Sequence, residues 1–146
     1  GALCLGTEWG AGRTSGAMGD AVGAIVVLAE DEPDLRAVYA ECLRRMGCIV
    51  WEAADGSEAS ELVRAHRPDL LVLDHWMPVL NGLEVLEQLR DAREAIGLKV
   101  VMLTHQRDAE TRLEGFALGV AAYWTKDLSL SELGDRVRAL LEPASA

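Results

Sequence analysis

The sequence predicts an α/β domain in which a doubly wound, five-stranded parallel sheet carries helices on both faces. Three observations support this prediction. Short apolar runs without alternation recur along the chain, as expected for strands that are buried on both faces of a sheet. A segment with helical spacing or a capping residue follows each run after a short connection, as parallel strands require. Several runs also end at polar residues, at the edge where open α/β sheets bind their ligands.

The expected strands are short and rich in Val, Ile and Leu. They are expected at residues 24–29, 49–51, 69–73, 99–103 and 121–125. The run at 70–73 is entirely apolar and leads straight into a carboxylate, Asp74. A buried charge is costly unless it is paired or bound to a metal, so Asp74 is expected to have a specific partner or a chemical role.

The expected helices carry apolar residues at three- and four-residue spacing, with start or stop signals at several of their ends. They are expected at residues 34–46, 57–66, 82–93, 108–118 and 129–141. Gly47 and Gly119 are stop signals for the first and fourth helices. Ser57 is expected to cap the second helix. Ser129 and Glu132 form an S-x-x-E capping box at the start of the last one.

The chain has 146 residues, which is enough for one domain with a normal core. We expect this domain to span residues 24–142. Residues 1–23 hold seven glycines and no regular period, which indicates a flexible tail, a tag remnant or a linker. Residues 143–146 are expected to form a short C-terminal tail.

Composition argues against several classes of protein. Half of the residues are hydrophobic, which argues against a disordered chain. There are 14 basic and 24 acidic residues, so the net charge of −10 argues against direct nucleic-acid binding and favours solubility or a cationic partner. Cys4, Cys42 and Cys48 form no C-x-x-C pair and are expected to be reduced thiols of a cytoplasmic protein. No apolar run is long enough to span a membrane.

Polar residues that can do chemistry follow four of the expected strands. Glu30 and Asp31 follow the first strand, and Asp74 follows the third. Thr104 follows the fourth strand, and Lys126 follows the fifth. Because the carboxyl ends of parallel strands lie at one edge of the sheet, we expect these side chains to converge.

Such a convergence suits phosphoryl transfer. Neighbouring carboxylates repel one another and favour a divalent cation, and oxygen-only ligands suit Mg²⁺. Lys126 and Thr104 can hold the oxygens of a phosphoryl group beside that ion. Asp74 can then act as a carboxylate nucleophile that becomes an aspartyl phosphate. The alternative interpretation is an acid–lysine ion-pair network without chemistry.

Four motifs at the strand ends carry a resemblance to a known family. They are Glu30-Asp31, Asp74-x-x-Met77-Pro78-x-x-x-Gly82, Val101-Met102-Leu103-Thr104 and Tyr123-x-x-Lys126. Together they resemble the receiver domains of two-component response regulators over roughly residues 24–142. The resemblance implies the strand order 2-1-3-4-5 of flavodoxin and the chemotaxis receivers. It also implies a bacterial, cytoplasmic switch that catalyses only its own phosphorylation and dephosphorylation, and not an enzyme.

By this resemblance, Asp74 is the phosphoacceptor and receives its phosphoryl group from a sensor histidine kinase or a phosphotransfer protein. Asp31, Asp74 and the backbone carbonyl of Trp76 would ligate Mg²⁺. Glu30 would bind this ion directly or through water. Lys126 would pair with the phosphoryl oxygens.

The resemblance also implies a conformational switch. Thr104 would move onto the phosphate and Tyr123 would turn inward behind it, which shifts the domain between two pre-existing states. The face built by the fourth helix, fifth strand and fifth helix would then change for an output domain or an effector protein. On that face, Arg112, Glu132 and Arg136 either support a weak homodimer or are solvated helix residues.

One departure from the family pattern follows Lys126. The next residue is Asp127, where the family commonly has a cis proline. Because a non-proline cis bond costs about 2.5–4 kcal/mol, we expect a trans Lys126–Asp127 bond and an altered loop path. Asp127 also places a negative charge near Lys126, where it can compete with phosphate.

Bulky residues surround the expected phosphorylation pocket. Trp76 and His105 are large for their positions, and with His75 and Met77 they are expected at the mouth of the pocket. They would restrict the access of water or of a phosphatase and so alter the lifetime of the phosphorylated form. His75 and His105 are alternative metal ligands, but histidine suits softer metals than Mg²⁺.

Two other functions compete with the switch. A phosphorylation-independent, receiver-like binding module would have lost a pocket residue, and none is missing from this sequence. A Mg²⁺-dependent phosphatase with an aspartyl nucleophile would usually carry a second acid two positions after Asp74, where this chain has Trp76.

Overall fold

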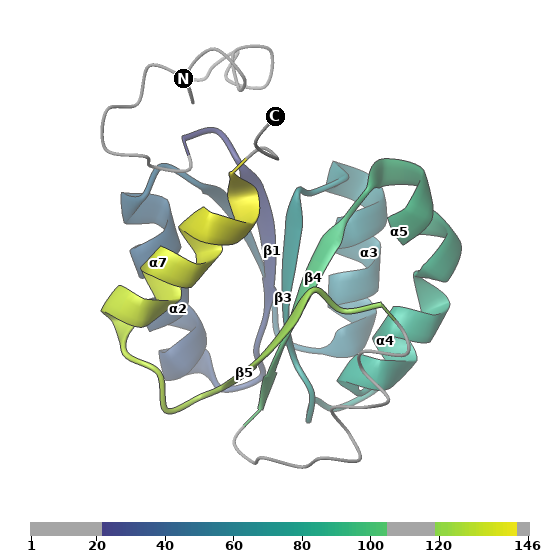
Figure 1. Cartoon of the computed structure of the whole chain (residues 1–146). Coiled ribbons are helices and arrows are strands. Elements are labelled where there is room, and N and C mark those ends of the chain that lie inside the picture. Colours follow the sequence, from purple (N-terminus) through teal and green to yellow (C-terminus); the bar gives the residue numbers. More distant parts are fainter. Residues whose placement is uncertain (1–21, 105–118, 143–146) are drawn as a thin grey trace.

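A five-stranded parallel sheet forms the centre of the domain (Figure 1). A computed structural model of the chain describes residues 22–104 and 119–142. In chain order, the strands are β1 (Ile25–Ala29), β2 (Ile49–Ala53), β3 (Leu70–Asp74), β4 (Lys99–Thr104) and β5 (Ala122–Thr125). Their order in the sheet is β2-β1-β3-β4-β5, and every pairing is parallel. The predicted fold class and strand order are therefore confirmed.

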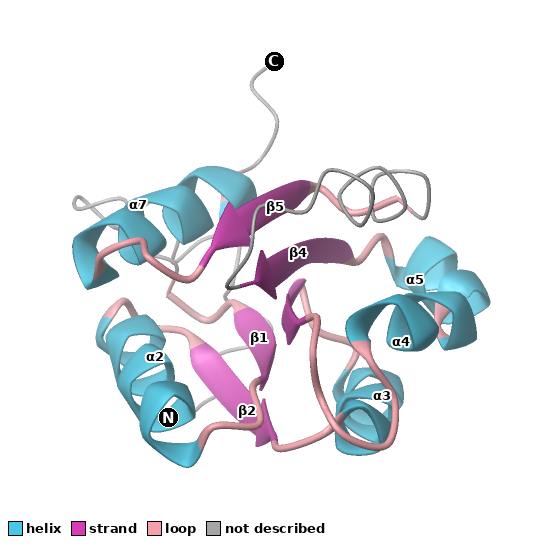
Figure 2. Cartoon of the chain, turned by 90° about the horizontal axis from the view of Figure 1, so that it is seen from below, coloured by secondary structure: helices cyan, strands magenta, loops and turns pink. Residues whose placement is uncertain are grey.

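Helices cover both faces of this sheet, as Figures 1 and 2 show. One face carries α2 (Pro33–Arg45) and α7 (Leu130–Leu141), and the other carries α3 (Gly56–His66), α4 (Gly82–Gln88) and α5 (Arg90–Ile96). Successive strand residues point to opposite faces. In β3, for example, Val72 packs under α2 and α7, whereas Leu71 packs on the side of α3 and α4. The core therefore has two layers with the sheet between them.

The central strand β3 explains the long apolar run in the sequence. All five of its residues are buried, because β1 and β4 flank it and helices cover both of its faces. Such a position favours a continuous apolar run over an alternating one. Asp74 is the last residue of this strand, so its carboxylate lies at the border between the apolar core and the edge of the sheet.

The carboxyl ends of the strands lie together at the lower edge in Figure 1, which Figure 2 shows from below. Asp74 is in register with Leu103, and Thr104 is in register with Thr125. Glu30 directly follows β1 and Lys126 directly follows β5. The topology therefore brings the polar residues at these strand ends to one edge.

The start of α3 differs from the prediction that Ser57 caps this helix. The N-cap is Asp55, whose Oδ1 accepts a hydrogen bond from Glu58 N at 2.9 Å. The Glu58 carboxylate in turn accepts a hydrogen bond from Ala54 N at 2.7 Å. The prediction for Ser57 is therefore wrong, because the Asp55 carboxylate reaches a free N–H of the first turn and the helix begins at Gly56.

The single helix predicted over 82–93 is instead divided into α4 and α5. Two guanidinium groups bind backbone carbonyls beside the division. Arg93 Nη2 donates to Leu86 O at 3.4 Å, and Arg64 Nη2 of α3 donates to Gln88 O at 3.2 Å. Side chains that insert into the backbone hydrogen-bond ladder interrupt helices, and a contact from another helix leaves no periodic signal in the sequence.

The other described boundaries agree with the predictions within two residues. The capping box of Ser129 and Glu132 is present at the start of α7. Gly47 follows the end of α2 with a φ of 96°, in the left-handed region that glycine tolerates. Most of the expected tail at 1–23, the expected helix at 108–118 and the tail at 143–146 lie outside the described residues.

Within residues 22–104 and 119–142, none of the helices combines the length and the apolar character that crossing a membrane requires.

Two glycines are expected to respond in opposite directions to the same substitution. A Cβ at Gly56 would lie 2.2 Å from Leu80 O and 2.8 Å from Val85 Cγ2, so alanine there forces packed groups apart. At Gly134, within α7, the nearest atom would be Met46 Sδ at 3.5 Å, which is an ordinary contact. We expect Gly56→Ala to lower the free energy of unfolding by about 1–3 kcal/mol. Gly134→Ala should raise it by up to about 1 kcal/mol through helix propensity.

Urea unfolding of the wild type and the two variants measures both changes. Destabilisation of similar size in the two variants would contradict the packing argument.

Candidate functional site

Glu30 is buried directly after β1 although it carries a carboxylate. Its side chain is only 1 % exposed. Its backbone N–H donates to Ala53 O at 3.0 Å, and its Oε2 accepts a hydrogen bond from Glu32 N at 3.1 Å. Arg36 Nη1 donates to its carbonyl oxygen at 2.8 Å. Glu30 is therefore held from several sides, whereas the next residue, Asp31, is exposed.

Asp74 is buried at the same edge of the sheet, at the end of β3. Its Oδ1 accepts a hydrogen bond from Trp76 N at 3.3 Å. The following loop is tied to the sheet, because His75 N donates to Leu103 O at 3.0 Å. His75 O also accepts a hydrogen bond from Gly82 N at 2.8 Å. The backbone that follows Asp74 is therefore fixed by hydrogen bonds to neighbouring elements.

Lys126 brings a cation between two of the acids. Its backbone N–H donates to Thr104 O at 2.8 Å, which continues the ladder between β4 and β5 beyond the last strand residue. Its Nζ lies 2.8 Å from Glu30 Oε1 and 3.1 Å from Asp74 Oδ1. The Lys126 side chain is 4 % exposed, so these ion pairs are shielded from water and salt. Thr104, the last residue of β4, is buried as well.

Burial shifts the protonation equilibria of this cluster. The pKa of Asp74 is raised from 3.8 to about 7, first by burial and then by the negative charge of Glu30, although Lys126 opposes the shift. Burial by itself would lower the pKa of Lys126, but the hydrogen bond to Glu30 and the charge of Asp74 outweigh it and raise that pKa. Burial and the charge of Glu30 together therefore outweigh the effect of Lys126 on Asp74, and a further cation would stabilise the ionised acids.

Three carboxylates are close enough to share one ion. Glu30, Asp31 and Asp74 each offer an oxygen, and these oxygens lie within 4.8 Å of one another. Glu30 and Asp74 are buried, whereas Asp31 is exposed, so the cluster faces solvent on the Asp31 side. A donor set made only of oxygens fits a hard cation such as Mg²⁺. The residues present therefore fit the magnesium site that the sequence predicts.

The residues after Asp74 divide between the interior and the surface. Trp76 is 59 % exposed, whereas His75 and Met77 are buried. The rings of His75 and Trp76 lie 4.3 Å apart and are tilted by 53°. Of the residues expected at the mouth of the pocket, Trp76 therefore faces solvent, and His75 and Met77 lie in the interior. His105 is outside the described residues.

Val79, in the same loop, has a backbone conformation that the sequence did not indicate. Its φ is 72°, a value that β-branched residues rarely adopt, and its side chain is exposed. The loop beside Asp74 therefore carries backbone strain, which is common next to functional groups.

The segment around Lys126 agrees with one prediction made from the departure at Asp127. The described residues contain no cis peptide bond, so the Lys126–Asp127 bond is trans as predicted. The Asp127 carboxylate accepts a hydrogen bond from the Thr125 hydroxyl. Asp127 is thus engaged by Thr125, while the Lys126 ammonium faces the acids of the cluster. Tyr123 of β5 is partly buried and packs against the core on the side of α3 and α4.

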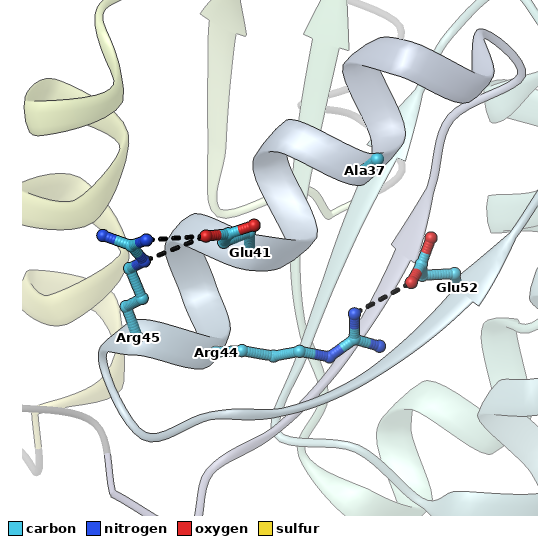
Figure 3. A pocket seen from close by; sticks show the side chains of 5 residues that line it. All are labelled: Ala37, Glu41, Arg44, Arg45 and Glu52. Carbon is cyan, nitrogen blue, oxygen red and sulfur yellow. Dashed lines mark hydrogen bonds and ion pairs between the residues drawn. The ribbon is translucent and has the colours of Figure 1, made fainter.

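A hollow lies beside α2 and β2 (Figure 3). It is lined by Ala37, Glu41, Arg44, Arg45 and Glu52. Arg45 Nη2 lies 2.8 Å from Glu41 Oε2, and Arg44 Nη1 lies 3.0 Å from Glu52 Oε2. The charges that line this hollow neutralise one another, so the acidic cluster at the sheet edge is the better candidate for a functional site.

Two residues of α2 near the site were missed from the sequence. Arg36 binds the carbonyl of Glu30. Tyr39 is buried, which raises its pKa, and it is within electrostatic range of Lys126 and the acids. The two residues lie three positions apart on the helix that directly follows the acids. Residues three positions apart lie on the same face of a helix, so this spacing could have indicated that both residues lie near the acids.

The raised pKa of Asp74 makes the stability of the metal-free domain depend on pH. Between pH 3.8 and about 7, the folded state retains a proton on Asp74 that the unfolded chain releases. The free energy of unfolding therefore falls as the pH rises through this window. Asp74→Asn removes the titrating group, while Lys126 keeps Glu30 as a partner at 2.8 Å. We expect this substitution to raise Tm more at about pH 8 than at about pH 5.

Thermal unfolding in the presence of a chelator measures this difference. Asp91→Asn, at an exposed acid of α5, is the control and should show no such pH dependence. If Asp74→Asn shifts Tm equally at both pH values, the proposed protonation of Asp74 is wrong.

Comparison with known proteins places the chain in a family. It matches the family model of the response regulator receiver domain over residues 26–138. The probable transcriptional regulatory protein TcrX of Mycobacterium tuberculosis is 40 % identical over 116 residues, which are 80 % of this chain and 49 % of TcrX. The alkaline phosphatase synthesis transcriptional regulatory protein PhoP of Bacillus subtilis is 34 % identical over 116 residues, which are 80 % of this chain and 48 % of PhoP. The chain thus spans about half the length of these relatives.

Solved structures share the fold. The receiver domain of the Francisella response regulator 1452 has a TM-score of 0.73 at 30 % identity, over 81 % of this chain and 96 % of that one. The chemotaxis protein CheY4 of Vibrio cholerae has a TM-score of 0.75 at 27 % identity, over 80 % of this chain and 98 % of that one. The family match, the strand order and the acidic cluster at the sheet edge agree with one another. The chain belongs to the family of response regulator receiver domains of two-component systems.

Proposed function

We propose that this domain is a phosphorylation-activated signalling switch in which Asp74 accepts a phosphoryl group. One observation carries the proposal: Asp74 lies 3.1 Å from Lys126 Nζ, and its carboxylate shares a cluster of oxygens within 4.8 Å with Glu30 and Asp31. An ion pair that only stabilised the fold would not need three carboxylates around one lysine, because the surplus acids repel one another.

The phosphoryl donor in this proposal is the phosphohistidine of a sensor histidine kinase or a phosphotransfer protein. An oxygen of Asp74 attacks the phosphorus, and a P–O bond forms while the P–N bond to the donor histidine breaks. The electron pair of that bond stays on the imidazole nitrogen. The receiver family is not an enzyme family, and the transfer and the later hydrolysis of the aspartyl phosphate are reactions of Asp74 itself.

The acids around Asp74 would hold the magnesium ion that such a transfer needs. Asp31, Asp74 and the backbone carbonyl of Trp76 are the direct ligands in this proposal, and Glu30 binds directly or through water. When bound, Mg²⁺ neutralises negative charge on the reacting oxygens. Glu30 and Asp31 supply the negative charge that attracts this ion to the edge of the sheet.

Lys126 and Thr104 would hold the phosphoryl group after the transfer. Lys126 Nζ is already 3.1 Å from Asp74 Oδ1, so it needs only a small movement to pair with a phosphoryl oxygen at that carboxylate. In this proposal Thr104, at the end of β4, moves its hydroxyl onto the phosphate, and Tyr123 of β5 turns inward behind it. Since phosphate binds one of two pre-existing states better, phosphorylation raises the population of that state. The surface around β5 and α7 changes with it.

The changed surface would act on an output domain or an effector protein in the cytoplasm. The chain spans about half the length of the regulators TcrX and PhoP. We also propose that any homodimer through this surface is weak. The Arg136 guanidinium already lies 5.7 Å from the centre of the Trp124 ring and 3.9 Å from Glu132 Oε2 within the chain. Arg112, the other charge expected on this surface, is outside the described residues.

Phosphorylation by a small donor tests the proposal directly. Incubation with acetyl phosphate and Mg²⁺ should add the mass of one phosphoryl group to the wild type. The gain should be lost in Asp74→Asn and after chelation of Mg²⁺, and it should persist in the surface control Asp91→Asn. A wild type that gains no phosphoryl group would favour a phosphorylation-independent binding module. Repeated turnover of phosphoesters would instead indicate a phosphatase.

The lifetime of the phosphorylated form tests the role of the bulky residues. Trp76→Ala and His105→Ala are expected to speed the loss of phosphate several-fold, because smaller side chains admit water to the aspartyl phosphate. Trp51→Ala is a matched control, since Trp51 is another exposed tryptophan and lies on β2. Release of radioactive phosphate from the phosphorylated proteins measures the rates. Unchanged rates in both pocket variants would refute this role.

A further inference from the structure

The acidic loop after β1 is anchored from outside the pocket by Arg36 of α2. Arg36 Nη1 donates to Glu30 O at 2.8 Å, and Arg36 Nε lies 3.4 Å from Glu52 Oε1. The side chains of Arg36 and Glu52 are 20 % and 32 % exposed, so water screens their ion pair only in part. Arg36 therefore connects the backbone of the acidic loop with a carboxylate on β2.

Glu52 is itself held in place from its other side. Its Oε2 lies 3.0 Å from Arg44 Nη1, and Arg44 Nη2 donates to Val50 O at 2.9 Å. Figure 3 shows the ion pair of Arg44 with Glu52, which are both among the residues that line the hollow beside α2. Both oxygens of Glu52 thus have guanidinium partners, one from each end of α2. The contacts form a continuous path from the edge strand β2 to the carbonyl of Glu30.

The position of this carbonyl matters because of the peptide geometry. The Glu30 carbonyl belongs to the planar group that joins Glu30 to Asp31. The contacts of Glu30 with Ala53 and Lys126 involve its N–H and its side chain, which lie outside this plane. Arg36 instead binds the carbonyl oxygen, which belongs to this planar group. It therefore constrains the direction in which the exposed Asp31 carboxylate leaves the backbone.

We propose that Arg36 is a positioning residue for the metal-binding acids, and that Glu52, held by Arg44, fixes the position of Arg36. The proposal rests on the proposed function in one respect, that the acids bind Mg²⁺. It extends that function by assigning the geometry of the acids to a salt-bridged network on the surface of α2 and β2.

Removal of Arg36 alone would mix two opposing effects. Its contact with Glu30 orders the acids, but its positive charge repels a cation. Removal of Glu52 avoids this problem, because the loss of order and the extra positive charge both weaken Mg²⁺ binding. A control is then needed for the charge.

Glu41 offers that control. It lines the same hollow as Glu52 and pairs with Arg45 at 2.8 Å (Figure 3). Glu41→Gln and Glu52→Gln remove the same charge. Glu41→Gln releases Arg45, whereas Glu52→Gln releases Arg36 and Arg44. Of the two carboxylates, Glu52 is the one that contacts Arg36.

The experiment is a calorimetric titration of the unphosphorylated protein with Mg²⁺. We expect Glu52→Gln to raise the Kd by about three- to tenfold, as the loss of one ordering contact does. Glu41→Gln should leave the Kd within about 1.5-fold of the wild type, because a distant exposed charge is screened. Arg36→Lys keeps the charge but loses the forked geometry, and it should raise the Kd as Glu52→Gln does. Adding Glu52→Gln to Arg36→Lys should then have little further effect.

Thermal unfolding without Mg²⁺ separates positioning from mere stabilisation. A lower Tm with an unchanged Kd in Glu52→Gln would mean that the network only stabilises the fold. Equal changes of Kd in Glu52→Gln and Glu41→Gln would mean that the lost charge alone explains the effect. Either result overturns the proposal. If the wild type binds Mg²⁺ and accepts phosphate from acetyl phosphate, such a result leaves the proposed function intact. A wild type that binds no Mg²⁺ would overturn both proposals.

Discussion

The ion pairs of Lys126 with Glu30 and Asp74 are the interaction on which the site depends. A buried ammonium is costly without partners, and so is a buried carboxylate. Here one cation is shared between two buried acids, with Asp31 close by, so negative charge is left over. Burial and the charge of Glu30 raise the pKa of Asp74, and a further cation would offset this excess of negative charge. The same imbalance lowers the stability of the metal-free domain at high pH.

The parallel sheet supplies the rigidity that this arrangement requires. Hydrogen bonds between backbones continue past the strand ends, from Glu30 N to Ala53 O, from His75 N to Leu103 O and from Lys126 N to Thr104 O. Glu30, His75 and Lys126 therefore extend the sheet although they belong to loops, and Asp74 and Thr104 are the last residues of their strands. Functional groups on such extensions keep their separations better than groups on free loops do. Arg36 adds a constraint on the side of the Glu30–Asp31 peptide group.

Local sequence patterns predicted much of the fold, and their failures have a common cause. Apolar runs and helical spacing located the described strands and most of the helices, because burial of one face is a property of each segment. The N-cap at Asp55 was missed in favour of Ser57, since both residue types are good caps and the backbone path decides between them. The division between α4 and α5 was missed because Arg64 reaches it from another helix.

By itself, the sequence determined the order of the elements, the deep burial of β3 and the identity of the polar residues at the strand ends. These are properties of short segments and of a topology that aligns all carboxyl ends. Only the tertiary structure decided that Lys126 lies between Glu30 and Asp74, that Trp76 is exposed while His75 is buried, and that Glu52 supports Arg36. Electrostatic energies and hydrogen bonds depend on distances between residues far apart in the chain, and no local pattern encodes those distances.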